Sequence, residues 1–167
     1  MILNMNKKVL IIGIIILIVV IVIGGYLFFN KQDENIQINI EELATQISQS
    51  GNFEDSIAKV DNEIVMEAYG FSNEEINEIV SYQGSGATSE ELVILQATDK
   101  SQLNSIKDKI SNRLTERKEA FESYLPEEVF KIDNHLLDIK GNYVILCISN
   151  DSSKVEEVIN NYIKDRG

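Results

Sequence analysis

The sequence has few of the residues that most often mark a chemical site: its 167 residues include no Trp, one Cys, one His and one Pro. A single cysteine excludes an intramolecular disulfide, so an apolar core must hold the folded part together. Cys147 lies in the β-prone run YVILCIS. This position is typical of a cysteine that is a small buried apolar residue and not a nucleophile. Zinc sites need three or four clustered ligands. His135 has only Asp133 and Asp138 near it in sequence, so we expect it to be an ordinary residue at the start of a strand and not a zinc ligand. We expect no metal and no cofactor.

Basic residues are also scarce. The chain has 27 Asp and Glu against 15 Lys and Arg, and only Lys7 and Lys8 of all these charges precede Asn30, which leaves a formal net charge of −14 from Asn30 onward. Nucleic-acid binding needs basic side chains that neutralise phosphates, so we expect no nucleic-acid partner. The same charge disfavours a domain that lies flat on anionic lipid, but it favours solubility of an exported domain.

One long apolar run stands near the N-terminus. Residues 9–29, VLIIGIIILIVVIVIGGYLFF, contain no charged side chain. At about 1.5 Å per residue, a helix of this length matches a hydrocarbon layer about 30 Å thick, so the run predicts a transmembrane helix in contact with membrane lipid. Lys7 and Lys8 precede it, and the positive-inside rule therefore places residues 1–8 in the cytoplasm.

A cleaved signal peptide is the main alternative to this anchor. A signal core has about 7–15 apolar residues and ends in a small-x-small site, whereas this run is longer and ends in the bulky residues YLFF. No Cys follows it directly, which excludes a lipoprotein anchor. We therefore expect a single-pass plasma-membrane protein with a short linker, residues 30–38, and an extracytoplasmic domain, residues 39–167.

Apolar periodicity and capping residues predict the helices of this domain. They are expected over residues 39–50, 62–69 and 101–124, and after a cap at Asp151 or Ser153. Asn39 and Glu42 fit a capping box for the first helix, and Gly70 stops the second. Apolar residues three, four or seven apart form one stripe along residues 101–124.

Two pairs of strands alternate with these helices. Residues 76–83 place Ile76, Val80 and Tyr82 on one side and Ile79 on the other, while LVILQA within 91–98 is apolar on both faces. A hairpin is expected across Lys140-Gly141-Asn142, and residues 53–60 are ambiguous. The order predicts an α+β fold, in which two ββα units follow the first helices and form an antiparallel sheet with helices packed on one face.

The glycine-rich stretch GSGATSEE, residues 84–91, is the nearest approach to a site motif. A phosphate-binding Walker loop needs a Lys facing the phosphates and a helix behind it. Here Glu90 and Glu91 would repel a phosphate, and a strand follows. The pattern therefore predicts a hairpin loop whose glycines supply positive φ. Binding of another ligand or a partner by this loop stays open. Its candidate residues are Gly84, Ser85, Gly86, Thr88, Glu90 and Glu91.

Weaker patterns suggest other chemistry. Ser56 and Lys59 match the Ser-x-x-Lys motif of penicillin-recognising enzymes, but the companion Ser-Asp-Asn and Lys-Thr-Gly motifs are absent. The acidic stretches DNE at 61–63 and NDSS at 150–153 lack the pattern of a calcium-binding EF-hand loop, so helix caps explain them better. With 27 acids no glycosidase-like pair stands out, and there is no Trp to stack on a sugar.

Several short motifs together resemble a known bacterial family. They are Tyr69-Gly70, Gly86-Ala87-Thr88 with Glu90-Glu91, Tyr124-Leu125-Pro126-Glu127, and Gly141-Asn142-Tyr143-Val144. They are similar to domain-of-unknown-function family 4358 over roughly residues 40 to 165. The resemblance implies a membrane-anchored or lipid-anchored protein of Gram-positive bacteria. It implies no activity, so no catalytic residue is carried over, and this chain departs from the lipid-anchored form because it has no lipobox Cys.

Three hypotheses follow for the function. The first is a non-enzymatic interaction or envelope-accessory module, displayed at the cell surface by its membrane anchor, with an unknown envelope protein as partner. The second is a small-ligand or cation-binding module that uses the loop at 84–91 and nearby acids. The third is an envelope hydrolase or transferase, for which Ser56 and Lys59 are the only pair that can be named.

Overall fold

The computed structural model describes Leu17, residues 36–50 and residues 52–166. The chain divides into two compact units, Met1–Asn35 and Ile36–Gly167. The predicted transmembrane helix at 9–29 belongs to the first unit and, apart from Leu17, lies outside the described residues. Within the described residues no helix is both long enough and apolar enough to cross a membrane. The anchor therefore stays a prediction.

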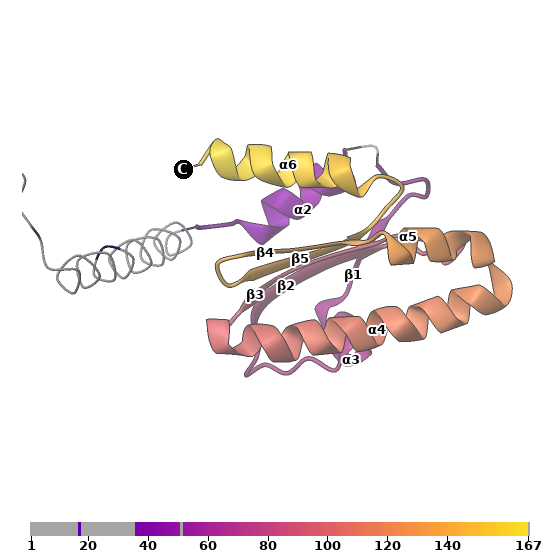
Figure 1. Ribbon diagram of the computed structural model, residues 1–167, viewed down its shortest axis with the longest axis horizontal. Coiled ribbons are helices and arrows are strands. Elements are labelled where there is room, and N and C mark those ends of the chain that lie inside the picture. Colours follow the sequence, from indigo (N-terminus) through magenta and orange to yellow (C-terminus); the bar gives the residue numbers. More distant parts are fainter. Residues whose placement is uncertain (1–16, 18–35, 51, 167) are drawn as a thin grey trace, which may run out of the picture. The chain divides into compact units, whose positions relative to one another are not determined.

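The second unit is an α+β domain built on one antiparallel sheet of five strands in the order β1-β2-β3-β5-β4 (Figure 1). The strands are β1 (Ala58–Val60), β2 (Ile76–Gln83), β3 (Glu91–Ala97), β4 (Leu136–Lys140) and β5 (Tyr143–Ile148). The helices are α2 (Ile40–Ser48), α3 (Asn62–Tyr69), α4 (Leu103–Tyr124), α5 (Val129–Asp133) and α6 (Ser152–Lys164), with 3₁₀ turns η1 (Lys100–Gln102) and η2 (Pro126–Glu128). Each predicted ββ hairpin is present, and each is followed by helix.

Helices cover both faces of the sheet, so the prediction that they pack on one face is wrong. α2 and α6 lie over one face, and α3, α4 and α5 lie over the other (Figure 1). The cause is the apolar content of the central strands. In β3, Leu92 and Ile94 join the core under α2 and α6, whereas Val93 and Leu95 join the core under α4. A strand that is apolar on both sides must be covered on both sides.

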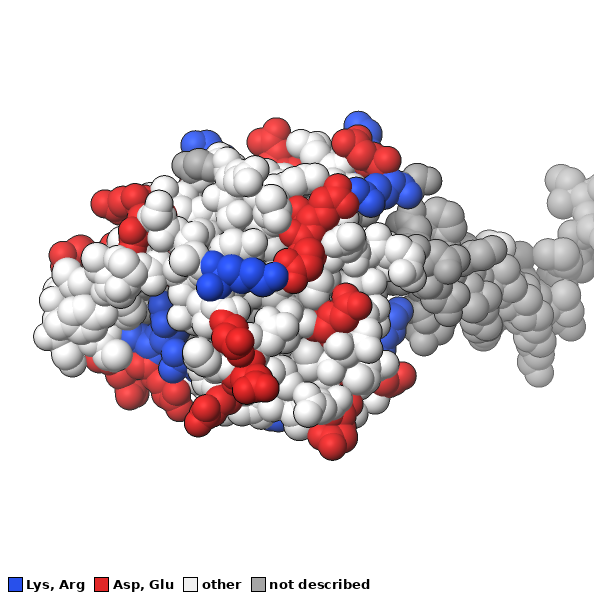
Figure 2. All heavy atoms as spheres, turned by 180° about the vertical axis from the view of Figure 1, so that it is seen from behind, with Lys and Arg blue, Asp and Glu red and all other residues white. Residues whose placement is uncertain are grey.

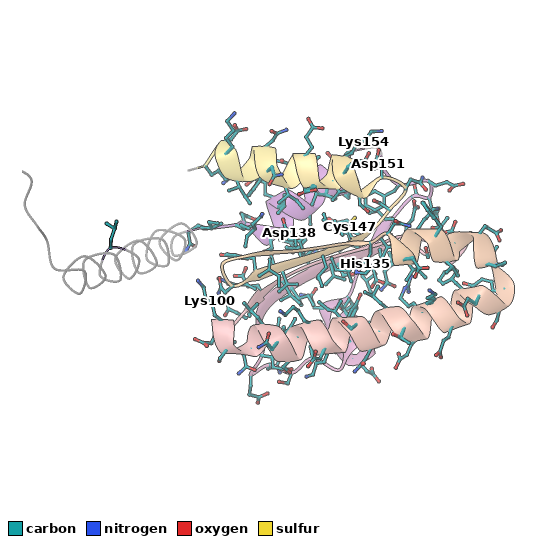
Figure 3. All side chains as sticks on the ribbon, in the orientation of Figure 1. Lys100, His135, Asp138, Cys147, Asp151 and Lys154 are labelled. Carbon is teal, nitrogen blue, oxygen red and sulfur yellow. The ribbon has the colours of Figure 1, made fainter. Side chains whose placement is uncertain are left out.

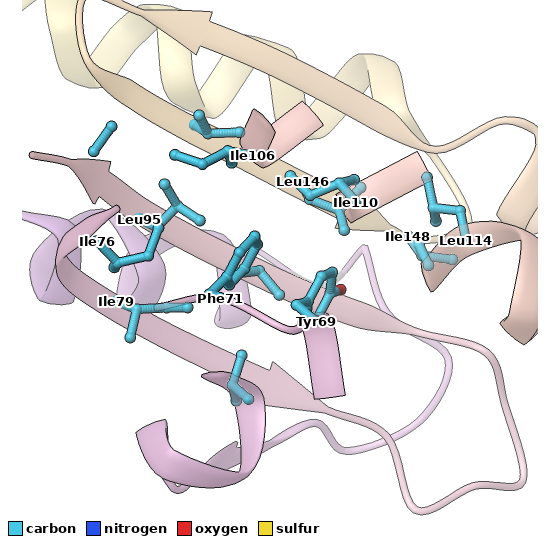
Figure 4. Packing of buried hydrophobic residues seen from close by; sticks show 14 of the residues in the cluster. Tyr69, Phe71, Ile76, Ile79, Leu95, Ile106, Ile110, Leu114, Leu146 and Ile148 are labelled. Atoms are coloured by element: carbon cyan, nitrogen blue, oxygen red, sulfur yellow. The ribbon is translucent and has the colours of Figure 1, made fainter. Parts of the chain in front are cut away.

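The core under α4 follows the stripe that the sequence predicts. Ile106, Ile110 and Leu114 of α4 pack onto the sheet beside Leu146 and Ile148 (Figure 4). Ile106 and Ile110 are fully buried. Replacing such a residue by Ala typically costs about 2–5 kcal/mol, because a cavity remains.

The ambiguous segment 53–60 contains the fifth strand. β1 has three residues, and it pairs antiparallel with Ser81–Gln83 of β2. Its residues are exposed or half-buried, so it lacks the apolar alternation that would have revealed it.

An irregularity in β2 changes which residues share a face. The pairing of β2 with β3 shifts between Ile76 and Glu78, which leaves Asn77 as an extra residue. Because a bulge resets the alternation of side chains, Ile76 lies in the same core as Ile79, and Val80 lies in the other. The expectation that Ile76 shares a side with Val80 is therefore wrong.

Most local capping predictions are confirmed, but the predicted capping box at the start of α2 forms only in part, because the N–H of Asn39 donates to the hydroxyl of Tyr162 and not to Glu42. The side chain of Asn39 accepts the N–H of Glu42 at the start of α2. Gly70 ends α3 with φ 66°, a left-handed conformation that favours glycine. Of the two candidate caps for α6, Asp151 is the one used: its carboxylate accepts the N–H groups of Ser153 and Lys154.

Candidate functional site

An open groove of about 1310 Å³ lies beside the outer edge of β2. One wall is the start of α2, and the other is α3 with the loop that follows it. The groove is lined by Gln37, Ile38, Asn39, Ile40 and Glu41, by Asn62, Glu63 and Met66, by Phe71, Ser72, Asn73 and Glu74, by Ile76, Asn77, Glu78 and Ile79, and by Gln96, Tyr143 and Arg166.

The groove exists because β1 is short. β1 pairs only with Ser81–Gln83, and the chain then turns away at Asp61 to begin α3. Within the described part of the chain, residues 76–80 of β2 therefore have a strand partner on the β3 side only. In an antiparallel sheet the backbone groups of successive residues point alternately to the two sides. Some N–H and C=O groups of this segment thus point away from β3, although the N–H of Ile76 is already bonded to the carbonyl of Ser72 and the irregularity at Asn77 interrupts the alternation.

The rim of the groove is acidic. Glu63, Glu74 and Glu78 are exposed, and they form no ion pair within the described residues. Arg166, the one basic residue among the described residues that line the groove, pairs with Glu42. Figure 2 shows the side of the molecule opposite to that of Figure 1, on which carboxylates are spread widely and basic side chains are few.

The glycine-rich loop at 84–91 lies elsewhere, and none of its residues lines the groove. Its main feature is the fully buried carboxylate of Glu90. This carboxylate accepts the N–H of Glu54 at 2.8 Å and that of Asp55 at 2.8 Å. The ammonium group of Lys131 lies 3.6 Å away. The carboxylate of Glu90 therefore binds groups inside the protein and holds the segment before β1 in place.

The loop is also tied to η2 and α5. Glu128 accepts both the N–H and the hydroxyl of Ser89, at 2.8 and 3.1 Å. Lys131 is nearly buried and lies 2.9 Å from Glu128 and 3.0 Å from Glu54. Burial by itself raises the pKa of Glu128, but the hydrogen bonds from Ser89 and Lys131 outweigh it and lower that pKa. Burial lowers the pKa of Lys131, but Glu128 and Glu54 outweigh it and raise that pKa.

Glu91 is the second fully buried acid of the loop. Its carboxylate accepts the side-chain amide of Gln83 at 2.8 Å and lies 3.2 Å from Nε of Arg117. Arg117 also donates to the carbonyl of Ser89. Tyr69 lies beside this pair, and burial, followed by the charge of Glu91, raises its pKa well above its usual value. These contacts join α3, α4 and the loop.

The remaining part of the loop turns the chain, as predicted, but of its two glycines only Gly86 has the predicted positive φ, whereas a Cβ at Gly84 would lie 2.8 Å from Oγ1 of Thr88. Gly84 donates its N–H to the carbonyl of Glu90, and Gly86 has φ 91°. The N–H and hydroxyl of Ser85 donate to Asp55, and these bonds lower the pKa of Asp55. The half-exposed Thr88 hydroxyl lies 3.3 Å from Glu90. The surface of the loop thus consists of residues 84–88, and ligand binding by it stays a prediction.

The other candidate residues have structural contacts. Lys59 binds both carboxylate oxygens of Glu41, at 2.6 and 2.8 Å, and this bond raises its pKa. A lysine that activates Ser56 would need a lowered pKa. Asp61, from the acidic stretch 61–63, caps α3.

Figure 3 labels His135, Asp138 and Cys147. Nδ1 of His135 lies 2.7 Å from the carbonyl of Ile132, just before β4. No group of three or more His, Cys, Asp or Glu that could hold a metal occurs within the described residues. Cys147 is fully buried, and burial raises its thiol pKa to about 12.

These observations define an α+β domain with a sheet covered on both faces and an acidic groove at one sheet edge. The family model described as "Domain of unknown function (DUF4358)" matches residues 49–149, and the chain belongs to this family. The matched region contains the whole sheet and α3 to α5, while α2 and α6 flank it. No significant match was found among curated proteins or among solved structures.

The motifs that carry the family resemblance make contacts that hold the fold together or turn the chain. Tyr69 stacks on Phe71 with ring centres 5.1 Å apart, and Gly70 ends α3. Glu90 and Glu91 anchor the loop, and Pro126 begins the turn that presents Glu128. Sequence reasoning missed the groove and the partners of these acids. Residues 53–60, which are ambiguous in sequence, contain the short strand β1 whose end opens the groove.

Proposed function

We propose that this protein is a single-pass membrane protein that displays its DUF4358 domain outside the cell membrane as a non-enzymatic interaction module. The observation that carries the proposal is the open groove at the β2 edge. An exposed strand edge with free backbone groups is a template for pairing with another chain. Proteins manage such edges by covering them or by using them as binding sites.

The sequence before the domain supports the location. Residues 9–29 are apolar and uncharged, and Lys7 and Lys8 precede them, which favours a cytoplasmic N-terminus. Gln37 at the groove is eight positions after Phe29, and a chain of that length reaches at most about 30 Å. The partner would therefore be another protein of the membrane or of the envelope close to it. The acidity of the domain supports a protein partner over anionic lipid.

Cysteine labelling in intact cells tests the location. Cys147 is the only native Cys and is fully buried, so it serves as an unreactive background. Asn160→Cys on the exposed side of α6 should react with a membrane-impermeant maleimide in intact cells. Asn6→Cys in the N-terminal segment should react only after permeabilisation. The opposite pattern would overturn the proposed orientation.

Crosslinking in living cells tests the interaction. Tagged full-length protein is crosslinked, purified and identified together with its products by mass spectrometry. A membrane or envelope protein recovered in repeated experiments, and not with an unrelated anchored domain, supports the proposal. Recovery of the protein alone contradicts it.

A further inference from the structure

We propose that the groove binds an extended, basic segment of a partner protein, which pairs with residues 76–80 of β2 as an added strand. This inference rests on the proposed function and specifies the partner. Three properties of the groove favour such a segment: its open backbone edge, its size and its charge.

The open edge continues the path of β1. β1 occupies the outer side of β2 as far as the pair Val60 and Ser81. Beyond it, five residues of β2 remain, which at about 3.3 Å per residue give about 17 Å of strand. An extended peptide that continues the line of β1 satisfies the outward N–H and C=O groups of this segment. Backbone hydrogen bonds then supply affinity, and side-chain pockets supply specificity.

The size of the groove fits a peptide better than a small molecule. Its volume of about 1310 Å³ exceeds the roughly 300–1,000 Å³ of typical small-molecule pockets. The two walls also suit a strand, whose side chains alternate between faces. Met66 and Phe71 lie on the α3 side, and Ile38 and Ile40 lie on the α2 side.

The charge of the rim selects a basic segment. Glu63, Glu74 and Glu78 are exposed and unpaired within the described residues. Lys59 and Arg166, the nearby cations, are neutralised by Glu41 and Glu42. Lys or Arg side chains of an added strand meet these carboxylates. A second copy of this chain would bring the same acidic rim to the edge, and the like charges would oppose pairing.

A peptide titration with a backbone readout tests the proposal. The full-length protein is held in nanodiscs of zwitterionic lipid, so that basic peptides do not bind the lipid. The probes are capped peptides of alternating Lys and Val, the same peptides with Glu in place of Lys, and Lys-Val peptides N-methylated at alternate residues. Binding is measured by fluorescence anisotropy, and amide hydrogen exchange is followed at residues 76–80.

We expect the Lys-Val peptide to bind and to slow amide exchange within residues 76–80, while the Glu-Val and N-methylated peptides do not. The triple variant Glu63→Gln, Glu74→Gln, Glu78→Gln should weaken binding about tenfold. The control triple variant Glu119→Gln, Glu122→Gln, Glu127→Gln removes three exposed acids away from the groove, and it should bind like the wild type. Thermal unfolding verifies that both variants fold.

Four results would overturn the inference: no binding, equal binding by both triple variants, protection of amides only outside residues 76–80, or protection of 76–80 before peptide is added. Protection before peptide is added would mean that another segment already pairs with residues 76–80. Light scattering tests whether that segment belongs to a second copy of the chain, and deletion of residues 30–35 tests whether it is this part of the same chain. A partner captured in cells together with a negative peptide result would reject the groove and retain the proposed function. The absence of any captured partner would reject the function itself.

Discussion

The backbone N–H of Asp55 donates to the buried carboxylate of Glu90 at 2.8 Å, although the two residues are 35 positions apart. The connection runs in both directions, because the carboxylate of Asp55 accepts the N–H of Ser85 in the same loop at 2.7 Å. These bonds hold the chain just before β1 against the turn between β2 and β3. The loop that resembles a ligand site in sequence therefore fixes the position of the edge strand, and so of the groove beside it.

Glu90→Gln should lower the free energy of unfolding by about 3 kcal/mol. The substituted amide places an N–H₂ group among donors, which are the N–H groups of Glu54 and Asp55 and the ammonium of Lys131. Urea unfolding measures the change. Glu127→Gln, at an exposed position in the same region, should change stability by less than about 0.5 kcal/mol. Equal stabilities of the two variants would show that Glu90 does not anchor the loop.

Gly86→Ala should cost about 1 kcal/mol through backbone strain alone. Gly86 has φ 91°, and a Cβ there would meet no atom within 4 Å, so the penalty comes from conformation and not from a clash. The control is Ala87→Gly in the same turn, because Ala87 does not have a positive φ. Thermal unfolding compares the two. A stabilising effect of Gly86→Ala would contradict the turn geometry.

Stability should fall at low pH through Glu75. Burial by itself raises the pKa of this carboxylate, but hydrogen bonds from Lys109, Ser105 and Ser72 outweigh it and bring the pKa to about 2, from a usual value of 4.5. A depressed pKa contributes stability above the unfolded-state value, which is lost as pH falls from about 4.5 toward 2. The contribution is about 3 kcal/mol.

The difference in unfolding free energy between the wild type and Glu75→Gln isolates this group from the other carboxylates. It should be largest above pH 5 and should shrink steadily on acidification. Urea titrations at a series of pH values measure it. A difference that stays constant down to pH 2.5 would contradict the assigned contacts of Glu75.

Cys147 should not react with thiol reagents in the folded protein, since it is fully buried and its thiol pKa is about 12. In urea, one thiol per chain should react. The exposed Asn160→Cys variant should show one fast-reacting thiol in the native state. Fast labelling of Cys147 itself in native buffer would mean that β5 opens readily.

Local signals in the sequence predicted much of the fold. α3 and β2 have the predicted bounds, because Gly70 ends the helix and the apolar pattern marks the strand. The prediction that helices pack on one face of the sheet is wrong, although LVIL in β3 is apolar on both faces and so indicates helices on both faces. The bulge at Asn77 leaves no local signal, because it depends on pairing with β3.

The sites were less predictable than the elements. Asp55, which binds Glu90, and Glu128, which binds Ser89, lie 35 and 39 positions away from them, so sequence spacing does not reveal these partners. The groove depends on where a three-residue strand ends, which hydrophobic periodicity cannot detect. The family match confirms the resemblance, but the contacts that explain its motifs appear only in the folded chain.

Position-specific photocrosslinking in the native host tests whether a partner protein occupies the groove beside β2. A photoreactive amino acid replaces Asn77 in the groove or, as the control, Glu119 on the exposed side of α4 in the full-length protein. We expect a defined protein product from position 77 that is absent from position 119 and is lost when Glu63, Glu74 and Glu78 are changed to Gln. A defined product from position 119 but none from position 77 would contradict this expectation.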